Sequence, residues 1–213
     1  ARPTAFAHMP LLVNEGRKKL SKRRDDVSMA DYRERGYLPE AMVNYLALLG
    51  WGPADGVEVR PVAEIVAQYR LEDVNASPAF FDQKKLSFVN AEHIRALSTD
   101  EFLARCRPFL TRGEPAVAAL ASLAAEVQER VRTLAEVEPM IEFLVVDEPT
   151  VDEASWTKAV TKGKAVPEML AATVARLDAL PADGWTPDPI EAAVRSAAVD
   201  AGIVNAEAES QLS

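Results

Sequence analysis

The stretch Leu38-Pro39-Glu40-Ala41-Met42-Val43-Asn44-Tyr45-Leu46-Ala47-Leu48-Leu49-Gly50 decides the fold class of this chain. Its apolar residues recur every three or four positions, which is the spacing of one face of an α-helix. Pro39 stands at the first helical position, where its missing N–H costs nothing, and Gly50 ends the helix. The stretch therefore predicts a helix that buries one face.

Similar signals extend the helical pattern in both directions. Ser28 predicts a capping box that begins a helix ended by Gly36. Asn90 and Ser98 are predicted N-caps, the latter with Glu101 three residues later. Farther along, Ala, Leu, Val and Glu dominate, and they predict helices over residues 115–136, 138–144, 152–162, 165–180 and 187–201.

A short apolar run over residues 5–13 predicts a buried β-strand. The predicted fold class is therefore mainly α, with a short β element and a basic loop at the N-terminus. A Gly-Glu-Pro sequence at Gly113 breaks the helical periodicity, and it is the predicted domain boundary. We expect three segments, which are residues 1–27, 28–112 and 113–213.

The composition excludes several classes of protein. The chain has 213 residues and 23.2 kDa, with 48% apolar and 27% charged residues and a mean hydropathy of -0.08, which suffices for a buried core. It contains no run of about 18 uncharged apolar residues, so the sequence predicts no membrane span. The first residues lack the layout of a signal peptide, and the single Cys106 excludes a disulfide scaffold. We expect a soluble, cytoplasmic protein.

The charge is unevenly distributed along the chain. The net charge of -9 argues against a nucleic-acid partner, because phosphate binding favours a basic face. Residues 1–112, however, hold 17 Lys and Arg against 15 Asp and Glu, whereas residues 113–213 hold 7 against 18. A polyanion would therefore bind mainly the first half, or isolated basic spots in the second.

One loop is rich in cations. Lys18-Lys19-Leu20-Ser21-Lys22-Arg23-Arg24 places five cations around one serine. Such a loop can neutralise the negative charge that grows on a triphosphate when one phosphorus is attacked. Taken alone, it is more often a solvated surface loop.

The context of this loop carries a family resemblance. The ordered motifs run from Phe6-Ala7-His8-Met9-Pro10 through Lys19-Leu20-Ser21-Lys22-Arg23 and Gly36-Tyr37-Leu38-Pro39-Glu40 to Asn44-Tyr45-Leu46 and Gly50-Trp51. They continue with Ser77-Pro78-Ala79-Phe80-Phe81-Asp82-Gln83-Lys84-Lys85-Leu86 and Arg130-Val131-Arg132-Thr133-Leu134. This set resembles the bacterial glutamyl-tRNA synthetases, in which Lys-Leu-Ser-Lys-Arg is the version of the class I "KMSKS" signature.

The resemblance implies a function for each segment. Residues 1–27 would end the catalytic domain and carry the KMSKS-type loop. Residues 28–112 would form the stem-contact fold, and residues 113–213 a helical anticodon-binding domain. The main catalytic fold would lie before residue 1, the last domain would be truncated, and this piece alone would not aminoacylate.

The resemblance also implies site residues. Lys22 would contact ATP during adenylation, and the ATP-binding loop would be Lys19, Leu20, Ser21, Lys22 and Arg23. ATP would come with Mg²⁺, bound mainly by the missing catalytic fold, and no metal site is expected in this chain. The expected partners are tRNA(Glu), glutamate and ATP, with no membrane, and the expected state is a monomer.

Four basic residues are candidate tRNA contacts. Lys84 and Lys85 stand among phenylalanines, so they fit an RNA backbone contact or, equally, a solvated helix end. Arg130 and Arg132 are two of only seven cations after residue 112. A guanidinium can hydrogen-bond a base edge, although nearby glutamates offer ordinary ion pairs. In discriminating family members, an arginine at the position of Arg130 lies near the last anticodon base.

Two alternatives stay open at the level of the sequence. A non-discriminating enzyme would also charge tRNA(Gln). A stand-alone helical module would use its acidic half to bind a protein partner.

Overall fold

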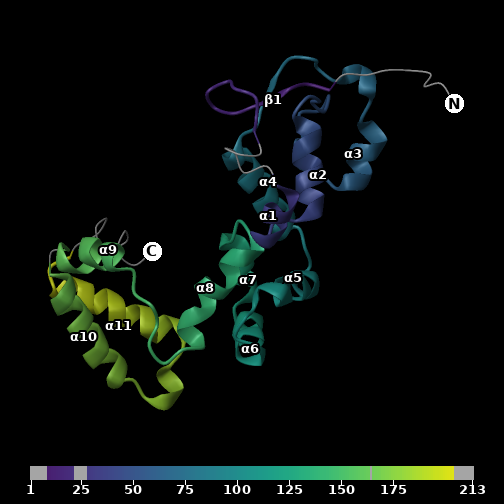
Figure 1. Ribbon diagram of the computed structural model, residues 1–213. Helices are drawn as coiled ribbons and strands as arrows, with labels where there is room; N and C mark the ends of the chain where they lie inside the picture. The colour runs from purple at the N-terminus through teal and green to yellow at the C-terminus, as the bar shows by residue number, and fades with distance from the viewer. Residues whose placement is uncertain (1–8, 22–27, 164, 204–213) are drawn as a thin grey trace. The chain divides into compact units, whose positions relative to one another are not determined.

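The computed structural model describes residues 9–21, 28–163 and 165–203 (Figure 1). The chain divides into two compact units, Ala1–Glu148 and Pro149–Ser213, and each is described by itself. Helices dominate both units, and two short strands lie in the first. The predicted class, mainly α with a short β element, is confirmed.

The first unit consists of short helices with two short strands. Its regular elements are β1 (Leu12–Val13), α1 (Met29–Glu34), α2 (Pro39–Leu48), α3 (Val62–Gln68), β2 (Ala79–Phe80), α4 (Gln83–Arg95), α5 (Thr99–Cys106), α6 (Glu114–Ser122), α7 (Ala124–Arg130) and α8 (Val137–Ile141). Single 3-10 turns connect them, namely η1 (Leu71–Asp73), η2 (Arg107–Phe109), η3 (Leu134–Glu136) and η4 (Glu142–Leu144).

The two strands pair although they are far apart in the sequence. β1 and β2 run parallel, with Leu12 opposite Ala79 and Val13 opposite Phe80. Of the strand predicted over residues 5–13, the structure shows Leu12–Val13 as strand, and residues 5–8 lie outside the described residues. The pairing ties the start of the basic loop to the segment that precedes α4.

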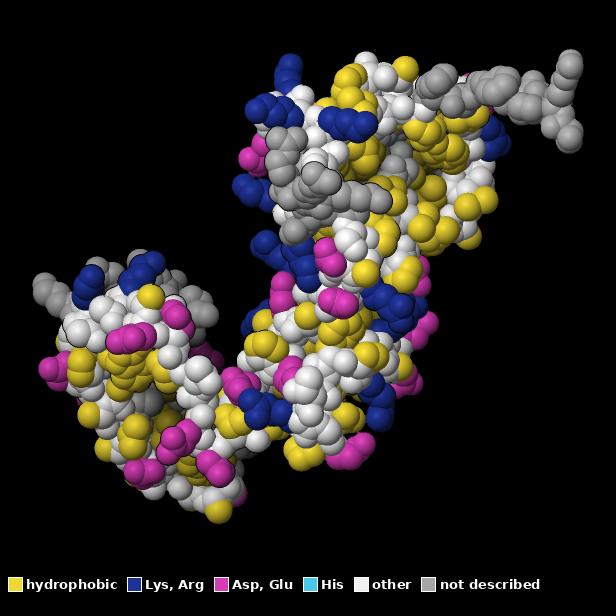
Figure 2. All heavy atoms as spheres, viewed as in Figure 1, with side chains coloured by type: hydrophobic (Ala, Val, Ile, Leu, Met, Phe, Trp, Pro, Cys, Tyr) yellow, Lys and Arg dark blue, Asp and Glu magenta, His cyan; other side chains and the backbone are white. Residues whose placement is uncertain are grey.

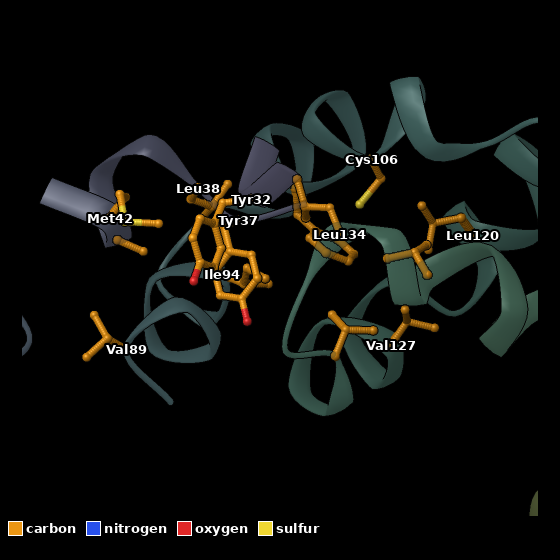
Figure 3. Packing of buried hydrophobic residues seen from close by; sticks show 14 of the residues in the cluster. Tyr32, Tyr37, Leu38, Met42, Val89, Ile94, Cys106, Leu120, Val127 and Leu134 are labelled. Carbon is orange, nitrogen blue, oxygen red and sulfur yellow. The ribbon is translucent and has the colours of Figure 1, made fainter. Parts of the chain in front are cut away.

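An aromatic cluster lies at the centre of the first unit (Figure 3). Tyr32 and Tyr37 meet edge to face with ring centroids 5.2 Å apart, and Tyr45 meets Phe81 in the same way, also at 5.2 Å. Each such pair adds about 0.5–1.5 kcal/mol beyond the burial of its area. Figure 3 draws Leu134 between the Tyr32–Tyr37 pair and the α6–α7 side of the cluster, so residues on both sides of the predicted boundary share this core.

The core does not break at residue 113. Phe102 of α5 is buried in the same cluster as Leu120 of α6 and Val127 of α7. The division into compact units falls after Glu148 instead. The three predicted segments, residues 1–27, 28–112 and 113–213, thus stay a prediction about functional parts.

The single helix predicted over residues 115–136 is wrong. It breaks at Leu123, whose backbone angles are φ −124° and ψ 22°, and α7 ends before Val131. Val131 and Thr133 are buried and have extended backbones. β-branched side chains favour that conformation, and it turns the chain out of the helix. The four later predictions are matched by α8 with η4, α9 with η5, α10 and α11.

Predicted caps have mixed outcomes. The capping box of Ser98 and Glu101 is confirmed, with both reciprocal hydrogen bonds present. Ser28 does begin α1, but its side chain makes no capping hydrogen bond. Asn90 is not a cap, because it lies inside α4 and is fully buried.

The second unit is a small helical assembly. It contains α9 (Glu153–Trp156), a π-helical turn η5 (Thr157–Thr161), α10 (Val166–Asp178), η6 (Ala182–Gly184) and α11 (Pro187–Asp200). α10 and α11 bury Val166, Met169, Ala197 and Ala198 together with Ile203. In the part of the chain that the structure describes, no helix has the length and apolar character needed to span a bilayer.

A buried polar network fixes the loop that follows α2. Asn44, which is 1% exposed, accepts a hydrogen bond from the Arg60 backbone N–H (3.0 Å) and donates to the carbonyl of Glu58 (2.8 Å). The same Asn44 oxygen lies 2.9 Å from Nε2 of the half-buried His93. Because an amide oxygen only accepts, Nε2 of His93 must carry the proton. Burial lowers the pKa of His93, and the nearby Glu40 carboxylate opposes this only in part.

We expect His93 to make folding pH-dependent. The pKa of His93 in the folded chain lies below its unfolded value of about 6.5, so the unfolded state takes up a proton first. Stability is therefore full above about pH 6.5 and falls as the pH drops towards the folded pKa. His93→Gln keeps an N–H donor without titrating. Urea unfolding between about pH 7.5 and 5 should show a decline in the original chain that is absent from the variant, and parallel curves would contradict this assignment.

Candidate nucleic-acid interface

The basic loop has an ordered base. Asn14 turns the chain, since its backbone N–H donates to the Lys18 carbonyl (2.9 Å) and its side chain accepts from the Lys18 N–H (3.1 Å). Lys19 pairs antiparallel with Val13, and the Leu20 N–H donates to the Leu12 carbonyl (3.1 Å). This turn brings the loop back beside β1.

The structure places part of the predicted ATP-binding loop. Lys19 is exposed, Leu20 is half-buried and packs on the core, and Ser21 is half-buried. Lys22 and Arg23 lie outside the described residues. Figure 2 shows Lys and Arg side chains gathered over the end of the first unit that carries β1 and its loop.

The second predicted contact, Lys84 with Lys85, lies in the first turn of α4. The Asp82 carboxylate caps this helix by accepting from the backbone N–H groups of Lys84 (2.8 Å) and Lys85 (3.2 Å). The Lys85 ammonium forms an ion pair with Glu58 at 2.6 Å, whereas Lys84 is exposed and has no ion pair among the described residues. Lys84 is therefore the lysine of this pair whose charge is available to an anion.

The phenylalanines around these lysines have different environments. Phe81 and Leu86 are core residues. Phe80 and Phe88 are 43% and 54% exposed. An exposed ring beside a lysine is the combination that stacks on a base while the cation meets a phosphate.

The third predicted contact, Arg130 with Arg132, lies where α7 ends. Both residues are exposed. The Arg130 guanidinium donates only to the carbonyl of Glu126 (3.3 Å), and the Arg132 backbone N–H donates to the Glu136 carboxylate (2.7 Å). Among the described residues neither guanidinium forms an ion pair, so the predicted ion-pair alternative is not seen.

Other described arginines contrast with these two. Arginines that pair with carboxylates include Arg60, Arg95, Arg105, Arg112, Arg176 and Arg195, bound to Asp55, Glu92, Glu40, Glu142, Asp200 and Glu191. The arrangement leaves Arg130 and Arg132 as two guanidinium groups facing solvent in the acidic half of the chain.

Two buried amides, Asn90 and Gln128, hold the arginine segment, which is residues 130–132. Sequence reasoning did not identify either amide as part of the site. The sequence predicts Asn90 as a helix N-cap and gives no role to Gln128. Gln128 is 7% exposed, and its amide donates to the carbonyls of Ile94 (2.8 Å) and Leu97 (2.9 Å) at the end of α4. The burial of both amides depends on contacts with distant segments, and a single sequence carries no signal for that.

The described residues contain no group of three or more His, Cys, Asp or Glu side chains close enough to hold a metal ion. Cys106 is buried, and burial raises its pKa to about 12, so its thiol stays protonated. The cationic side chains described above suit phosphate oxygens.

Comparison with known proteins gives two family matches and several relatives. Residues 1–88 match the family "tRNA synthetases class I (E and Q), catalytic domain", and residues 101–208 match "Anticodon binding domain". A glutamate–tRNA ligase of Thermobifida fusca is 47% identical over 208 residues, which cover 94% of this chain and 43% of that protein. The glutamate–tRNA ligase of Mycolicibacterium smegmatis is 44% identical over 200 residues, which cover 92% of this chain and 40% of that protein. The chain thus spans less than half the length of these relatives.

Solved structures agree with the sequence relatives. A glutamate tRNA ligase from Elizabethkingia meningosepticum, crystallised with its amino acid, superposes with a TM-score of 0.66 at 26% identity, over 93% of this chain and 43% of that one. A glutamate-tRNA synthetase from Elizabethkingia anophelis has the same fold, with a TM-score of 0.66 at 24% identity, over 95% of this chain and 44% of that one. The anticodon-binding match alone takes in more than half of the chain. The chain therefore belongs to the glutamate–tRNA ligase family of class I tRNA synthetases.

Proposed function

We propose that this chain is the ATP-loop and tRNA-binding part of a glutamate–tRNA ligase, which attaches glutamate to tRNA(Glu) with ATP. The observation that carries the proposal is the exposed pair Arg130 and Arg132, which lies within the anticodon-binding match without ion pairs among the described residues. The rest of this segment has a net negative charge. Guanidinium groups without ion pairs among the described residues can there hydrogen-bond base edges and phosphates.

The whole enzyme would work in two steps. The glutamate carboxylate attacks the α-phosphorus of ATP, which forms glutamyl-adenylate and releases pyrophosphate. A ribose hydroxyl at the 3′ end of the tRNA then attacks the activated carbonyl, and AMP leaves. Lys22 would stabilise the negative charge on the phosphates in the first step, since a cation aimed at developing charge lowers the barrier.

The loop base supports this role for Lys22, which itself lies outside the described residues. Leu20 packs on the core and hydrogen-bonds to β1, so the chain enters the loop from a fixed point two residues before Lys22. Lys19, Ser21 and Arg23 would join it in ATP binding. Mg²⁺ would be carried by the phosphates of ATP, because these cationic side chains suit phosphate oxygens and offer no metal ligands.

The tRNA would contact two basic sites on the first unit. Lys84 and Lys85 would contact the RNA backbone on the stem side, with Lys85 exchanging its Glu58 partner, and Arg130 and Arg132 would meet the anticodon arm. We further propose that the enzyme is a cytoplasmic monomer, that the three segments serve as catalytic end, stem-contact fold and anticodon-binding domain, and that this chain alone does not aminoacylate.

The salt dependence of tRNA binding tests the proposal. The 213-residue chain should bind an in vitro transcript of a bacterial tRNA(Glu), and the affinity should fall by about tenfold or more between about 50 and 200 mM salt, because each neutralised phosphate releases a counterion. A tRNA for an unrelated amino acid should bind more weakly. Affinity that barely changes with salt, or equal binding of the unrelated tRNA, would contradict the proposal.

The test also separates the alternatives. Equal affinity for tRNA(Glu) and tRNA(Gln) would indicate a non-discriminating enzyme. The exposed Arg130 favours the discriminating one, and the relatives do not favour a stand-alone protein-binding module.

A further inference from the structure

α4 holds the arginine segment at two points, one on each side of Arg130. On one side, Gln128 donates to the carbonyls at the C-terminal end of α4. On the other side, Nδ2 of Asn90 donates to the carbonyl of Arg132 at 2.6 Å. The two anchors lie two residues before and two residues after Arg130, so α4 fixes the backbone on both sides of that side chain.

Asn90 uses both ends of its amide. While Nδ2 binds the Arg132 carbonyl, Oδ1 accepts from the Leu38 backbone N–H at 2.8 Å. Its side chain is 0% exposed. A buried amide whose oxygen and nitrogen are both hydrogen-bonded has one orientation. If either partner is removed, a buried polar group is left without a hydrogen bond and without access to water. Asn90 therefore locks the Arg132 carbonyl to the turn that precedes α2.

Gly36 makes a second connection between the same two segments. Its carbonyl accepts from the Leu134 backbone N–H at 3.0 Å. A Cβ at this position would lie 2.5 Å from the Ala135 nitrogen and 2.6 Å from the Leu134 nitrogen, so the two backbones are in direct contact. The segment around Arg132 is thus held from α4 and from the turn between α1 and α2.

The hold determines where the arginine side chains point. Val131 and Thr133 have extended backbones and are buried on either side of Arg132, whose side chain is exposed. The backbone N–H of Arg132 donates to Glu136, and its carbonyl accepts from Asn90. With both peptide groups of this residue fixed, the side chain starts from a set position and direction.

We propose that Asn90 is a positioning residue for tRNA recognition, which acts through the backbone of Arg132 to present the arginine pair in its binding geometry. The inference rests on the proposed tRNA-binding function. A preorganised site loses less entropy on binding than one that must order its side chains and backbone first. Loss of the Asn90 anchor should therefore weaken RNA binding even where the chain stays folded.

The test is a double-mutant cycle in tRNA(Glu) affinity with Asn90→Asp and Arg132→Ala. The aspartate keeps the acceptor for Leu38 but faces the Arg132 carbonyl with an oxygen, so this anchor is lost. Asn44→Asp is the matched control, because Asn44 is also a buried helix amide with two backbone partners, and the change adds the same charge. Asn90→Ser, which is smaller and uncharged, serves if the aspartate variant does not fold, and melting curves check each variant.

We expect Asn90→Asp to weaken tRNA binding by about tenfold more than Asn44→Asp, as the loss of one buried hydrogen bond at a binding segment allows. In the Arg132→Ala background this extra loss of affinity should shrink to about twofold or less, because the guanidinium that Asn90 is proposed to position is then absent. An equal loss for the two aspartate variants, or an undiminished loss without the Arg132 side chain, would overturn the inference. If Arg130→Ala and Arg132→Ala both bind like the original chain, the proposed function itself fails.

Discussion

Gly36→Ala is expected to destabilise the first unit by about 3 kcal/mol or more, the largest effect that we predict for a single methyl group. Gly36 has φ +81°, a region that an alanine enters only at a cost of about 1 kcal/mol. The added Cβ would also lie 2.5–2.9 Å from backbone atoms of Leu134 and Ala135, which cannot rotate away as a flexible side chain could. The thermal midpoint of the unit should fall by about 6–12 °C in calorimetry.

Gly56→Ala separates the two contributions. Gly56 has φ +74°, nearly the same backbone conformation, but no described atom lies within 4 Å of the added Cβ. It should cost only the conformational part, about 1 kcal/mol. Equal midpoints for the two variants would show that the close approach of Gly36 to the Leu134 segment is wrong.

Lys22→Ala in the full-length ligase is expected to slow adenylation by about a hundredfold or more, because removal of one preorganised group that stabilises transition-state charge has an effect of that size. The decrease should be in kcat for glutamate-dependent exchange of pyrophosphate into ATP, since this exchange reports the first step alone. The affinity for tRNA(Glu) should stay nearly unchanged, because Lys22 is proposed to act on ATP.

Lys18→Ala is the matched control for Lys22. Lys18 carries the same charge in the same loop, and its ordered contacts are made by its backbone, with Asn14. Exchange activity should stay within about threefold of the original enzyme, as for a surface charge screened by water. Full exchange activity in the Lys22 variant, or an equal loss in both variants, would remove Lys22 from its proposed role.

The helices of this fold could be predicted where local signals decide. Pro39 sets the start of α2, and the Ser98–Glu101 capping box sets the start of α5, because both effects involve residues within one turn. The break of the helix predicted over residues 115–136 could not be predicted in this way. Val131 and Thr133 are buried against segments that are distant in the sequence. The free energy gained by this burial does not depend on the helical spacing of apolar residues.

In the candidate site, too, local features could be predicted and tertiary contacts could not. The exposure of Lys84, Arg130 and Arg132 could be predicted from residue type, because a cationic side chain favours water, and their contact with tRNA stays a proposal. The residues that place them could not. Asparagine is a residue type that favours helix N-caps. Only the tertiary contacts with Leu38 and Arg132 show that Asn90 is a buried anchor.

The most direct test of the proposed tRNA recognition is the affinity of the 213-residue chain for tRNA(Glu) and tRNA(Gln) before and after Arg130→Ala. Arg195→Ala removes the same charge from an arginine that is already paired with Glu191 at 2.7 Å, so it controls for net charge. We predict that Arg130→Ala weakens tRNA(Glu) binding by about tenfold and removes the preference over tRNA(Gln), as the loss of one base-edge contact allows, while Arg195→Ala changes neither. Unchanged affinity and preference in the Arg130 variant would contradict this role of Arg130.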